Sequence, residues 1–561
     1  MTPYPLHTTR HSESCNDIWD FAFLGAIDPA VVDVARVRYD DRLPVPLAFD
    51  ATPKYAGRRG TAVYRRWLDI PAGRLAKLRF GGAGMWCAVF VDGCRLTEHG
   101  NGYTEFHVEI PPAASNRREL VVVTDNQFCA ERNPVQMEYY DWYHYGGLYR
   151  PVWLHVLPPA YLATAQVTVR DLAAGRIRVR VTLGGAAVSA VKLTAAIDGT
   201  IVQDATVSVT DGAFTLDLTV PDPHPWSPAD PHLHTLRLAT ADDDLIVRFG
   251  LRTLQVDGAR LLLNGAPLKL KGFCRHEAHP QFGPALPPAL MIQDLQQLKD
   301  MGCNFIRGSH YPQDQRFLDL CDELGLLVWE EATAWGNKEA HFRDAHFCEA
   351  QLRGVAEMIA ASFNHPSVIL WGFLNEGDTR TTSGRDLYRR MADLCHRLDP
   401  SRPVTFGDMH AASICLPLAD VISFNLYPAW YGSETIEQVP QALRDRVAVA
   451  RQTTGDVRPF IVSEIGAAAM YGCRDNHGTR WSEQYQARLL ETVCGEVLTN
   501  PDILGVSFWQ FCDMRTSEEV ARVLQRPRAF NNKGVMDEYR RPKQAYFSVR
   551  DAFTAPPRRE S

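Results

Sequence analysis

The stretch "CNFIRGSHYPQDQRFLDLCDELGLLVWEEA", residues 303–332, contains two apolar runs on either side of a segment with helical spacing. The runs in 303–312 and 325–332 are near-continuous in apolar residues at their centres, which is typical of strands buried on both faces of a parallel sheet. The segment 313–323 between them predicts a helix. Together they predict a strand–helix–strand unit, the building block of a parallel sheet.

The same rhythm recurs along the chain from residue 254 onward. Further candidate strands are "LKLKGFCRHE" (268–277), "SVILWGFLNEG" (367–377), "PVTFGD" (403–408), "VISFNLYP" (421–428), "FIVSEIG" (460–466) and "ILGVSFWQF" (503–511). Predicted helices between the strands lie at 286–301, 347–362, 383–397, 437–453 and 481–498. Eight alternating strand–helix units over about 300 residues predict a (β/α)8 TIM barrel.

The first 250 or so residues predict β-structure. Short apolar runs such as "CAVFVDGCRL" (87–96) and "ELVVVTDN" (119–126) are separated by turn signals. After residue 157, segments such as Arg176–Val181 alternate between polar and apolar residues, the pattern of a β-sandwich with one wet face. We expect three domains: a β-rich N-terminal domain over 1–157, an immunoglobulin-like β-sandwich over 158–253 and the barrel over 254–561.

Composition excludes several classes of function. The chain has 561 residues, a net charge of −7 and no long basic run, so we expect no nucleic-acid partner. No apolar stretch approaches the roughly 20 residues that span a bilayer, so we expect no membrane association. The N-terminus is polar and lacks the apolar core and cleavage site of a signal peptide. The 13 cysteines are scattered along the chain without a CxxC pair. These features indicate a cytoplasmic protein with reduced thiols. The sequence does not determine the oligomeric state, and it is compatible with a homo-oligomer.

Polar side chains end every candidate barrel strand. In a TIM barrel the active site lies at the carboxyl ends of the strands, so these side chains should meet at one mouth. They are Arg275, His276, Glu277, Arg307, Ser309, His310, Tyr311, Glu330, Glu331, Asn375, Glu376, Asp408, His410, Asn425, Tyr427, Glu464 and Trp509.

Two of these carboxylates stand out. Glu376 ends the fourth strand and Glu464 ends the seventh, each directly after an apolar run. Strands four and seven lie across the barrel from one another, so the two carboxyls can face each other over its mouth. Such a pair suits glycoside hydrolysis, in which one carboxyl acts as a general acid and the other as a nucleophile or base. A single strand-end Glu could equally serve as a helix-capping partner or in an ion pair.

Other catalytic patterns are missing. "RHEAH" (275–279) is not the HExxH zinc motif, "GGAGMW" (81–86) is followed by no phosphate-binding signature, and no GxSxG nucleophile elbow occurs. We therefore expect no metal and no cofactor.

The chain resembles glycoside hydrolase family 2 over nearly its whole length. The stretches that carry the resemblance are "GFCRHE" (272–277), "IRGSHYP" (306–312), "NHPSVILWGFLNEGD" (364–378), "IVSEIG" (461–466) and "RRPKQAYFSVRDAF" (540–553). The resemblance implies a jelly-roll-like sugar-binding domain, an immunoglobulin-like sandwich and a catalytic TIM barrel. It also implies Glu376 as acid/base and Glu464 as nucleophile, with retention of configuration. By the same resemblance Asn375 binds the sugar 2-hydroxyl, and the sugar subsite is lined by His276, Tyr427, Tyr431 and Trp509.

Within the family the chain is most similar to β-glucuronidases. These enzymes read the sugar carboxylate with an Asn-x-Lys-Gly motif, and "NNKG" (531–534) matches it, which implies roles for Asn531 and Lys533. They also carry an Asp that reaches the sugar, matched here by Asp141 in "DWYHYGG". An Arg usually stands four residues before the motif. Pro527 occupies that position, so we expect Arg528 to contact the carboxylate, with Arg526 as the alternative.

Two further departures concern the catalytic strands. The family pattern Asn-Glu-Pro is Asn375-Glu376-Gly377 here, and Glu-Tyr-Gly is Glu464-Ile465-Gly466. Taken alone, "NNKG" would predict a hairpin turn with Lys533 in solvent. Placed after the eighth strand of a glycosidase barrel, the same motif predicts a carboxylate-binding site, because an ammonium and an amide donor both bind carboxylates well.

The sequence thus predicts an exo-acting retaining β-glucuronidase whose partner is a β-linked uronide or oligosaccharide. A β-galacturonidase or β-galactosidase on the same fold is the alternative. A carbohydrate-binding protein without activity is a further one, although a binder does not need both glutamates.

Overall fold

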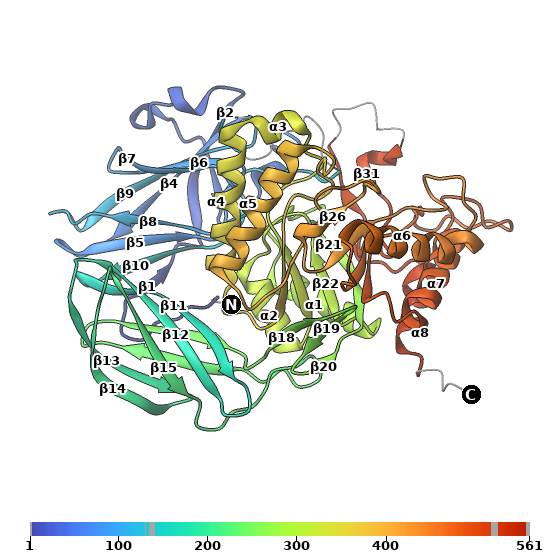
Figure 1. Cartoon of the computed structure of the whole chain (residues 1–561). Helices are drawn as coiled ribbons and strands as arrows, with labels where there is room; N and C mark the ends of the chain where they lie inside the picture. Colours follow the sequence, from blue (N-terminus) through green and yellow to red (C-terminus); the bar gives the residue numbers. More distant parts are fainter. Residues whose placement is uncertain (1–2, 130, 134–140, 518–524, 557–561) are drawn as a thin grey trace.

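The computed structural model describes residues 3–129, 131–133, 141–517 and 525–556. Two β-sandwiches, coloured blue to green in Figure 1, lie beside a barrel coloured yellow-green to red. Within the described residues, no helix combines the length and apolar character needed to cross a membrane.

The barrel sheet has the parallel order β25-β24-β23-β22-β21-β29-β28-β27-β26. Its strands are β21 (Leu270–Arg275), β22 (Phe305–Gly308), β23 (Leu327–Glu331), β24 (Val368–Gly372), β25 (Val404–Thr405), β26 (Gly407–Asp408), β27 (Ile422–Asn425), β28 (Phe460–Glu464) and β29 (Gly505–Phe508). The two edge strands, β25 and β26, are consecutive pieces of one chain segment interrupted at Phe406. The sheet therefore closes around eight strand positions, which confirms the predicted TIM barrel.

Helices cover the barrel (Figure 1). They are α1 (Pro288–Asp300), α2 (Gln315–Leu324), α3 (Glu339–Arg343), α4 (Ala345–Ser362), α5 (Thr382–Leu398), α6 (Val439–Thr454), α7 (Glu483–Thr499) and α8 (Gln544–Thr554). All of them except α3 and α8 lie at predicted places. After the fifth strand the chain forms a 3-10 turn, Leu416–Leu418, with Pro417 in its first turn. This departure from a regular (β/α)8 pattern leaves the six predicted helices in place.

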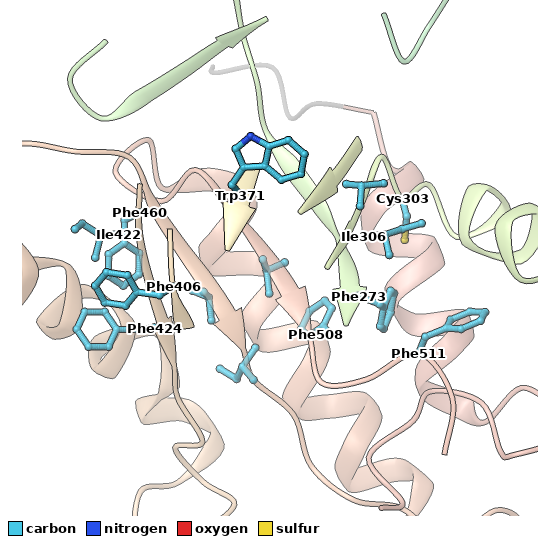
Figure 2. Close-up of a cluster of buried hydrophobic side chains, with 14 of the residues drawn as sticks. Phe273, Cys303, Ile306, Trp371, Phe406, Ile422, Phe424, Phe460, Phe508 and Phe511 are labelled. Carbon is cyan, nitrogen blue, oxygen red and sulfur yellow. The ribbon is translucent and has the colours of Figure 1, made fainter. Parts of the chain in front are cut away.

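Alternation along the strands sorts the barrel side chains between two layers. Phe305, Leu327 and Trp329 belong to a cluster inside the barrel. Their neighbours Ile306 and Val328 pack outward under the helices. Figure 2 shows this outer layer, which includes Phe273, Phe424, Phe460 and Phe508. By the same alternation Arg307 and Glu331 point into the barrel, and Glu330 points into the helical layer.

The N-terminal sandwich packs a six-stranded antiparallel sheet on a four-stranded one. The six strands are β2 (Ile18–Gly25), β3 (Asp41–Pro44), β4 (Thr61–Asp69), β6 (Trp86–Val91), β7 (Cys94–His99) and β9 (Arg117–Asp125). The four are β1 (Ser12–Ser14), β5 (Leu75–Phe80), β8 (Phe106–Ile110) and β10 (Val152–Leu157). Phe21, Tyr64 and Leu78 share the core between them.

The second sandwich packs sheets of order β11-β12-β15 and β14-β13-β16-β17. Its strands are β11 (Ala160–Asp171), β12 (Arg176–Gly185), β13 (Ala190–Ile197), β14 (Thr200–Ser208), β15 (Ala213–Thr219), β16 (His234–Ala239) and β17 (Asp244–Phe249). A small sheet of β18 (Leu254–Asp257), β19 (Arg260–Leu263) and β20 (Ala266–Pro267) leads into the barrel. The domain boundaries at 157 and 254 stay predictions; β10 ends at Leu157 and β18 begins at Leu254.

A buried ion pair holds the N-terminal sandwich on the barrel mouth. Arg150 donates to Glu277 at 2.8 Å and to the carbonyl oxygen of Pro312 at 2.7 Å. Both charged side chains are buried. Because Arg150 lies three residues after "DWYHYGG" (141–147), this contact places that loop over the ends of the barrel strands.

Candidate active site

Arg307 at the end of β22 connects the two strand-end glutamates to the rest of the mouth. Its guanidinium donates to Glu464 at 2.8 Å and to Asn375 Oδ1 at 2.7 Å. It also pairs with Glu331 at 2.9 Å, and it lies 4.4 Å from the ring centroid of Trp329. Two carboxylates and a ring face thus fix the orientation of one buried cation.

Glu464 at the end of β28 is held at both carboxylate oxygens. Oε1 accepts from Arg307, and Oε2 accepts from the hydroxyl of Tyr427 at 2.7 Å. The register between β27 and β28 shifts so that Asn425 pairs with Glu464. This irregularity at the strand end turns the carboxyl toward the mouth rather than into the wall.

Glu376 stands on an unusual backbone after β24. Its φ is +52° and that of Leu374 is +49°, a left-handed conformation that L-residues seldom adopt. The Glu376 amide donates to the carbonyl of Gly407 at 2.9 Å, and the Tyr388 hydroxyl donates to Leu374 at 2.8 Å. These bonds support the turn that presents the Glu376 side chain to the mouth.

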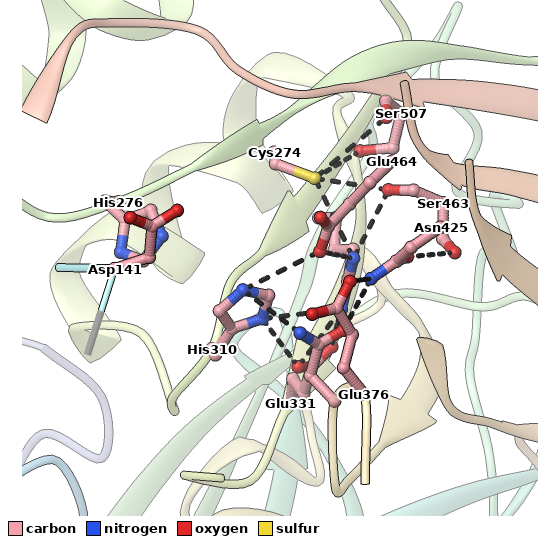
Figure 3. A network of polar contacts seen from close by, with 12 residues as sticks. Asp141, Cys274, His276, His310, Glu331, Glu376, Asn425, Ser463, Glu464 and Ser507 are labelled. Carbon is pink, nitrogen blue, oxygen red and sulfur yellow. Dashed lines mark hydrogen bonds and ion pairs between the residues drawn. The ribbon is translucent and has the colours of Figure 1, made fainter. Parts of the chain in front are cut away.

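An amide network joins Glu376 to the Glu464 side of the mouth. Asn425 Nδ2 donates to Glu376 Oε1 and to Asn375 Oδ1, both at 3.0 Å. Asn425 Oδ1 accepts from Ser463, the neighbour of Glu464, at 2.8 Å. Figure 3 shows Glu376, Asn425, Ser463 and Glu464 within one network of polar contacts. The structure therefore brings the two predicted glutamates to the same place.

Burial shifts the protonation of both glutamates. It raises the pKa of Glu464; the Arg307 charge opposes this rise and the Glu376 charge adds to it. Burial also raises the pKa of Glu376, and the hydrogen bond from Asn425 opposes that rise. Because the two carboxylates repel each other, ionising both at once is unfavourable. The pair therefore favours states that keep one proton.

Aromatic and imidazole rings form the wall beside the glutamates. His276 Nδ1 contacts the Tyr311 hydroxyl at 3.2 Å, while its buried Nε2 has no hydrogen-bond partner within the described part of the chain. Trp509 stacks on His310 with 5.2 Å between ring centroids. In the view of Figure 3, Asp141 lies beside His276. A polar ligand in the mouth would meet an unsatisfied imidazole nitrogen here.

A second cluster of polar groups joins the N-terminal sandwich to the loop after β29. Asp141 accepts from Arg526 through both oxygens, each at 2.6 Å, and from Asn531 at 2.8 Å. Lys533 Nζ donates to the Tyr431 hydroxyl at 2.8 Å. Arg526 Nη2 also reaches that hydroxyl at 3.4 Å. The contacts gather two cations, one amide and one phenol around a single carboxylate.

Comparison with known proteins agrees with this arrangement. Residues 254–555 match the family model "Glycosyl hydrolases family 2, TIM barrel domain", and residues 160–252 match "Glycosyl hydrolases family 2". The chain belongs to glycoside hydrolase family 2. It is a glycoside hydrolase with the three-part architecture of that family.

The chain is similar to proteins named as enzymes that act on uronides. A β-glucuronidase of Paenibacillus borealis is 27% identical over 91% of each chain. A GH2 β-galacturonidase from Eisenbergiella tayi, solved bound to galacturonate, is 35% identical with a TM-score of 0.90 over 98% of each chain. A β-D-glucuronidase of Dictyoglomus thermophilum is 26% identical with a TM-score of 0.85 over 99% of each chain.

The structure separates the two arginines that flank Pro527 in this family 2 hydrolase. Arg526 is buried against Asp141. Arg528 has a φ of +62°, pairs with Glu538 at 3.0 Å and keeps 51% of its side chain exposed. It lines a separate cavity of about 310 Å³ with Tyr145 and Phe530. Arg526, and not Arg528, is thus the arginine beside Asp141 and Asn531, and the contact of either arginine with a sugar carboxylate stays a prediction.

Arg307, Glu331 and Asn425 carry no assigned role in the sequence-based expectation, although each ends a candidate strand. Their position at the end of a predicted barrel strand was the sequence feature that could have identified them as site residues. Their function in the network depends on partners contributed by other strands, such as Asn375 and Glu464.

Proposed function

We propose that this family 2 hydrolase is an exo-acting, retaining β-uronidase. The observation that carries the proposal is the pairing of two sites: strand-end glutamates joined by one network, and a buried lysine in the loop after the last barrel strand. The first suits cleavage of a glycosidic bond, and the second suits a sugar carboxylate.

Glu464 is the proposed nucleophile. Arg307 and Tyr427 donate to its two oxygens, so its ionised form is stabilised and its orientation fixed. A neutral amide donates to Glu376 instead. The proton that the pair retains therefore belongs on Glu376, which protonates the leaving oxygen as Glu464 attacks the anomeric carbon. Glu376 then takes a proton from the water that releases the sugar from Glu464.

Asn375 and His276 are proposed to bind sugar hydroxyls. Asn375 Oδ1 already accepts from Arg307 and Asn425, which fixes the amide and leaves Nδ2 as its donor. This suits the 2-hydroxyl next to the anomeric carbon. The unsatisfied Nε2 of His276 suits a second hydroxyl, with Trp509 and Tyr427 completing the wall.

Lys533 is the proposed reader of the sugar carboxylate. Lys533 is 2% exposed, and its ammonium donates to a phenol, that of Tyr431. Within the described residues, no carboxylate oxygen lies within 4.0 Å of it. Burial and the nearby Arg526 lower the pKa of Lys533. An incoming carboxylate would supply the missing counter-charge, with Asn531 as a further donor.

The β-D-galacturonide is the expected preferred substrate, and the β-D-glucuronide is the second candidate. The first is supported by the galacturonidase of Eisenbergiella tayi, at 35% identity, and the second by relatives named β-glucuronidases at about 27%. The two sugars differ in the orientation of one hydroxyl, and the proposed contact for that hydroxyl is Asp141 with its partner Arg526.

The test compares nitrophenyl β-D-galacturonide, β-D-glucuronide and β-D-galactoside. We expect turnover of one or both uronides with kcat/KM well above that for the galactoside. Lys533→Met should reduce uronide turnover while leaving any galactoside turnover unchanged. A galactoside preference, or no uronide turnover, would overturn the proposal.

A further inference from the structure

A cavity of about 380 Å³ lies where the two sandwiches and the barrel meet. Lys77 and His155 of the first sandwich line one side, Arg248 of the second lines another, and Asp319 and Asn364 of the barrel line the third. The volume falls within the range of small-molecule sites, which often occur at domain junctions.

One wall of this cavity is the outer face of a sheet. Lys77 on β5 lies opposite His155 on β10, and His155 lies opposite Ser12 on β1. Paired residues point to the same face, and the alternation that puts Leu78 in the core puts Lys77 and Arg79 on this face. Such a polar face is ordinarily open to water. Here the barrel and the second sandwich cover it, and Lys77 is 8% exposed.

The guanidinium groups that line the cavity have acidic partners, whereas Lys77 has none among the described residues. Arg10 pairs with Asp243 at 2.7 Å, Arg79 with Glu105 at 2.6 Å and Arg248 with Asp319 at 3.0 Å. In the described parts of the chain, Lys77 Nζ has no carboxylate oxygen within 4.0 Å. It lies 5.1 Å from the ring centroid of Tyr161. A buried ammonium without a counter-charge is costly unless a ligand supplies one.

The barrel side of the cavity offers acceptors for hydroxyl groups. Asp319 Oδ2 is buried and has no hydrogen-bond partner in the described structure. Asp319, Asp322 and His365 lie close enough to one another to suggest a cation site. However, His365 is bonded to Asp322 at 2.6 Å, and the Arg248 guanidinium already sits on Asp319. The open oxygen of Asp319 therefore suits a hydroxyl donor better than a metal ion.

We propose that this cavity binds a small polyhydroxylated organic acid, with its carboxylate on Lys77 and its hydroxyl groups toward Asp319 and His155. A free hexuronate, the product of the proposed activity, belongs to this class. The site stands on its own geometry, so it can exist whichever sugar the active site cleaves.

The test uses calorimetric titration of the full-length protein with D-galacturonate. Since this ligand can also occupy the active site, the Lys533→Met variant serves as the background. We expect Lys533→Met to retain one binding site and Lys77→Met in that background to weaken it at least tenfold. The control Lys192→Met changes an exposed lysine of the second sandwich and should leave binding unchanged.

D-galactose and inorganic phosphate test which chemical groups of the ligand the cavity recognises. D-galactose should not bind to this site, and inorganic phosphate should bind more weakly than galacturonate. Burial lowers the pKa of Lys77 to about 8. Galacturonate binding at pH 8 should therefore take up protons in the Lys533→Met protein and not after Lys77→Met, which titration in buffers of different ionisation enthalpy measures.

Three results would overturn the proposal: no galacturonate binding by Lys533→Met, binding unaffected by Lys77→Met, or phosphate binding as tightly as galacturonate. If Lys77→Met does not fold, Lys77→Gln replaces it. Uronide turnover by the single Lys77→Met variant should equal that of the wild type. Turnover thus reports on the proposed function separately from the cavity.

Discussion

Arg307 donates to Glu464 at 2.8 Å from the opposite side of the barrel interior, so the proposed nucleophile has a fixed cationic partner. The same guanidinium pairs with Glu331, and all three side chains are buried. Charge balance at the bottom of the site therefore depends on one arginine.

Replacing this cation should affect both stability and activity. Arg307→Gln leaves two buried carboxyls without their counter-charge, which should cost about 3–5 kcal/mol of unfolding free energy. It should also raise the pKa of Glu464 further and move the acidic limb of kcat/KM to higher pH. Denaturant unfolding and a pH–rate profile measure these effects.

Arg275→Gln is a matched control for this prediction. Arg275 forms an equally buried ion pair with Asp294 at 2.9 Å, and Asp294 has a second partner in Arg540 at 3.0 Å. It should lose stability without moving the pH–rate profile. A shifted profile in Arg275→Gln, or an unshifted one in Arg307→Gln, would contradict the assigned role of Arg307.

Glu376→Gln should change the pH dependence in a defined direction. Activity requires ionised Glu464 and protonated Glu376, so kcat/KM falls at low pH through the first group and at high pH through the second. Glu376 raises the pKa of Glu464. Its removal should therefore move the acidic limb to lower pH and abolish the alkaline limb.

This profile is best measured with a nitrophenyl uronide, whose leaving group needs little protonation. Substrates with poor leaving groups should lose a further 10²–10⁴-fold in turnover, the scale of general acid catalysis. A retained alkaline limb in Glu376→Gln would assign the acid to another residue.

Arg526 and Arg528 should differ sharply in their effect on uronide turnover. Arg526→Gln removes the partner of Asp141 next to Asn531 and should cost about 2–5 kcal/mol in kcat/KM, the scale for truncating a buried charge pair. Arg528→Gln breaks a half-exposed pair with Glu538, and its kcat/KM should stay within about 0.5 kcal/mol of the wild-type value. Equal losses in the two variants would refute the placement of Arg526 in the substrate site.

Glu330 should make stability depend on pH. Burial raises its pKa to about 7, and both of its carboxyl oxygens lack a hydrogen-bond partner within the described residues. The folded state binds the proton more tightly, so its contribution is complete below about pH 4.5 and is lost as pH rises through about 7. Glu330→Gln removes this loss. Between pH 4.5 and pH 8, this group should therefore make the unfolding free energy of wild type fall by about 3 kcal/mol more than that of Glu330→Gln.

Unfolding in denaturant at the two pH values tests this difference. Glu331→Gln is no substitute, because Glu331 pairs with Arg307. If wild type and Glu330→Gln show the same change in unfolding free energy between pH 4.5 and 8, Glu330 is not protonated in the folded state.

The fold was predictable from sequence because the barrel strands are buried on both faces. Their near-continuous apolar runs, such as 367–374 before Asn375 and Glu376, mark both the strand and its polar end. The break at Phe406 was not predictable, since it depends on how that segment packs on its neighbours. The sequence predicted no helix after the fifth strand, and the structure has only the 3-10 turn Leu416–Leu418 there.

The substrate end of the site was only partly predictable. Asn531 and Lys533 follow from their motif, but the choice between Arg526 and Arg528 depends on the turn at Pro527. A left-handed backbone at Arg528 sends neighbouring side chains to opposite sides. The contact between Arg526 and Asp141 joins residues 385 positions apart. Local sequence carries no information on such a pairing.

The most direct measurement of the central claim is covalent trapping on Glu464. A 2-fluoro-β-uronosyl fluoride, galacturonosyl or glucuronosyl, should form a stable glycosyl-enzyme because fluorine slows its hydrolysis. Peptide mass spectrometry should then find one uronosyl group on Glu464, absent from Glu464→Gln. No adduct with either reagent, or an adduct on another residue, would contradict a retaining β-uronidase with Glu464 as its nucleophile.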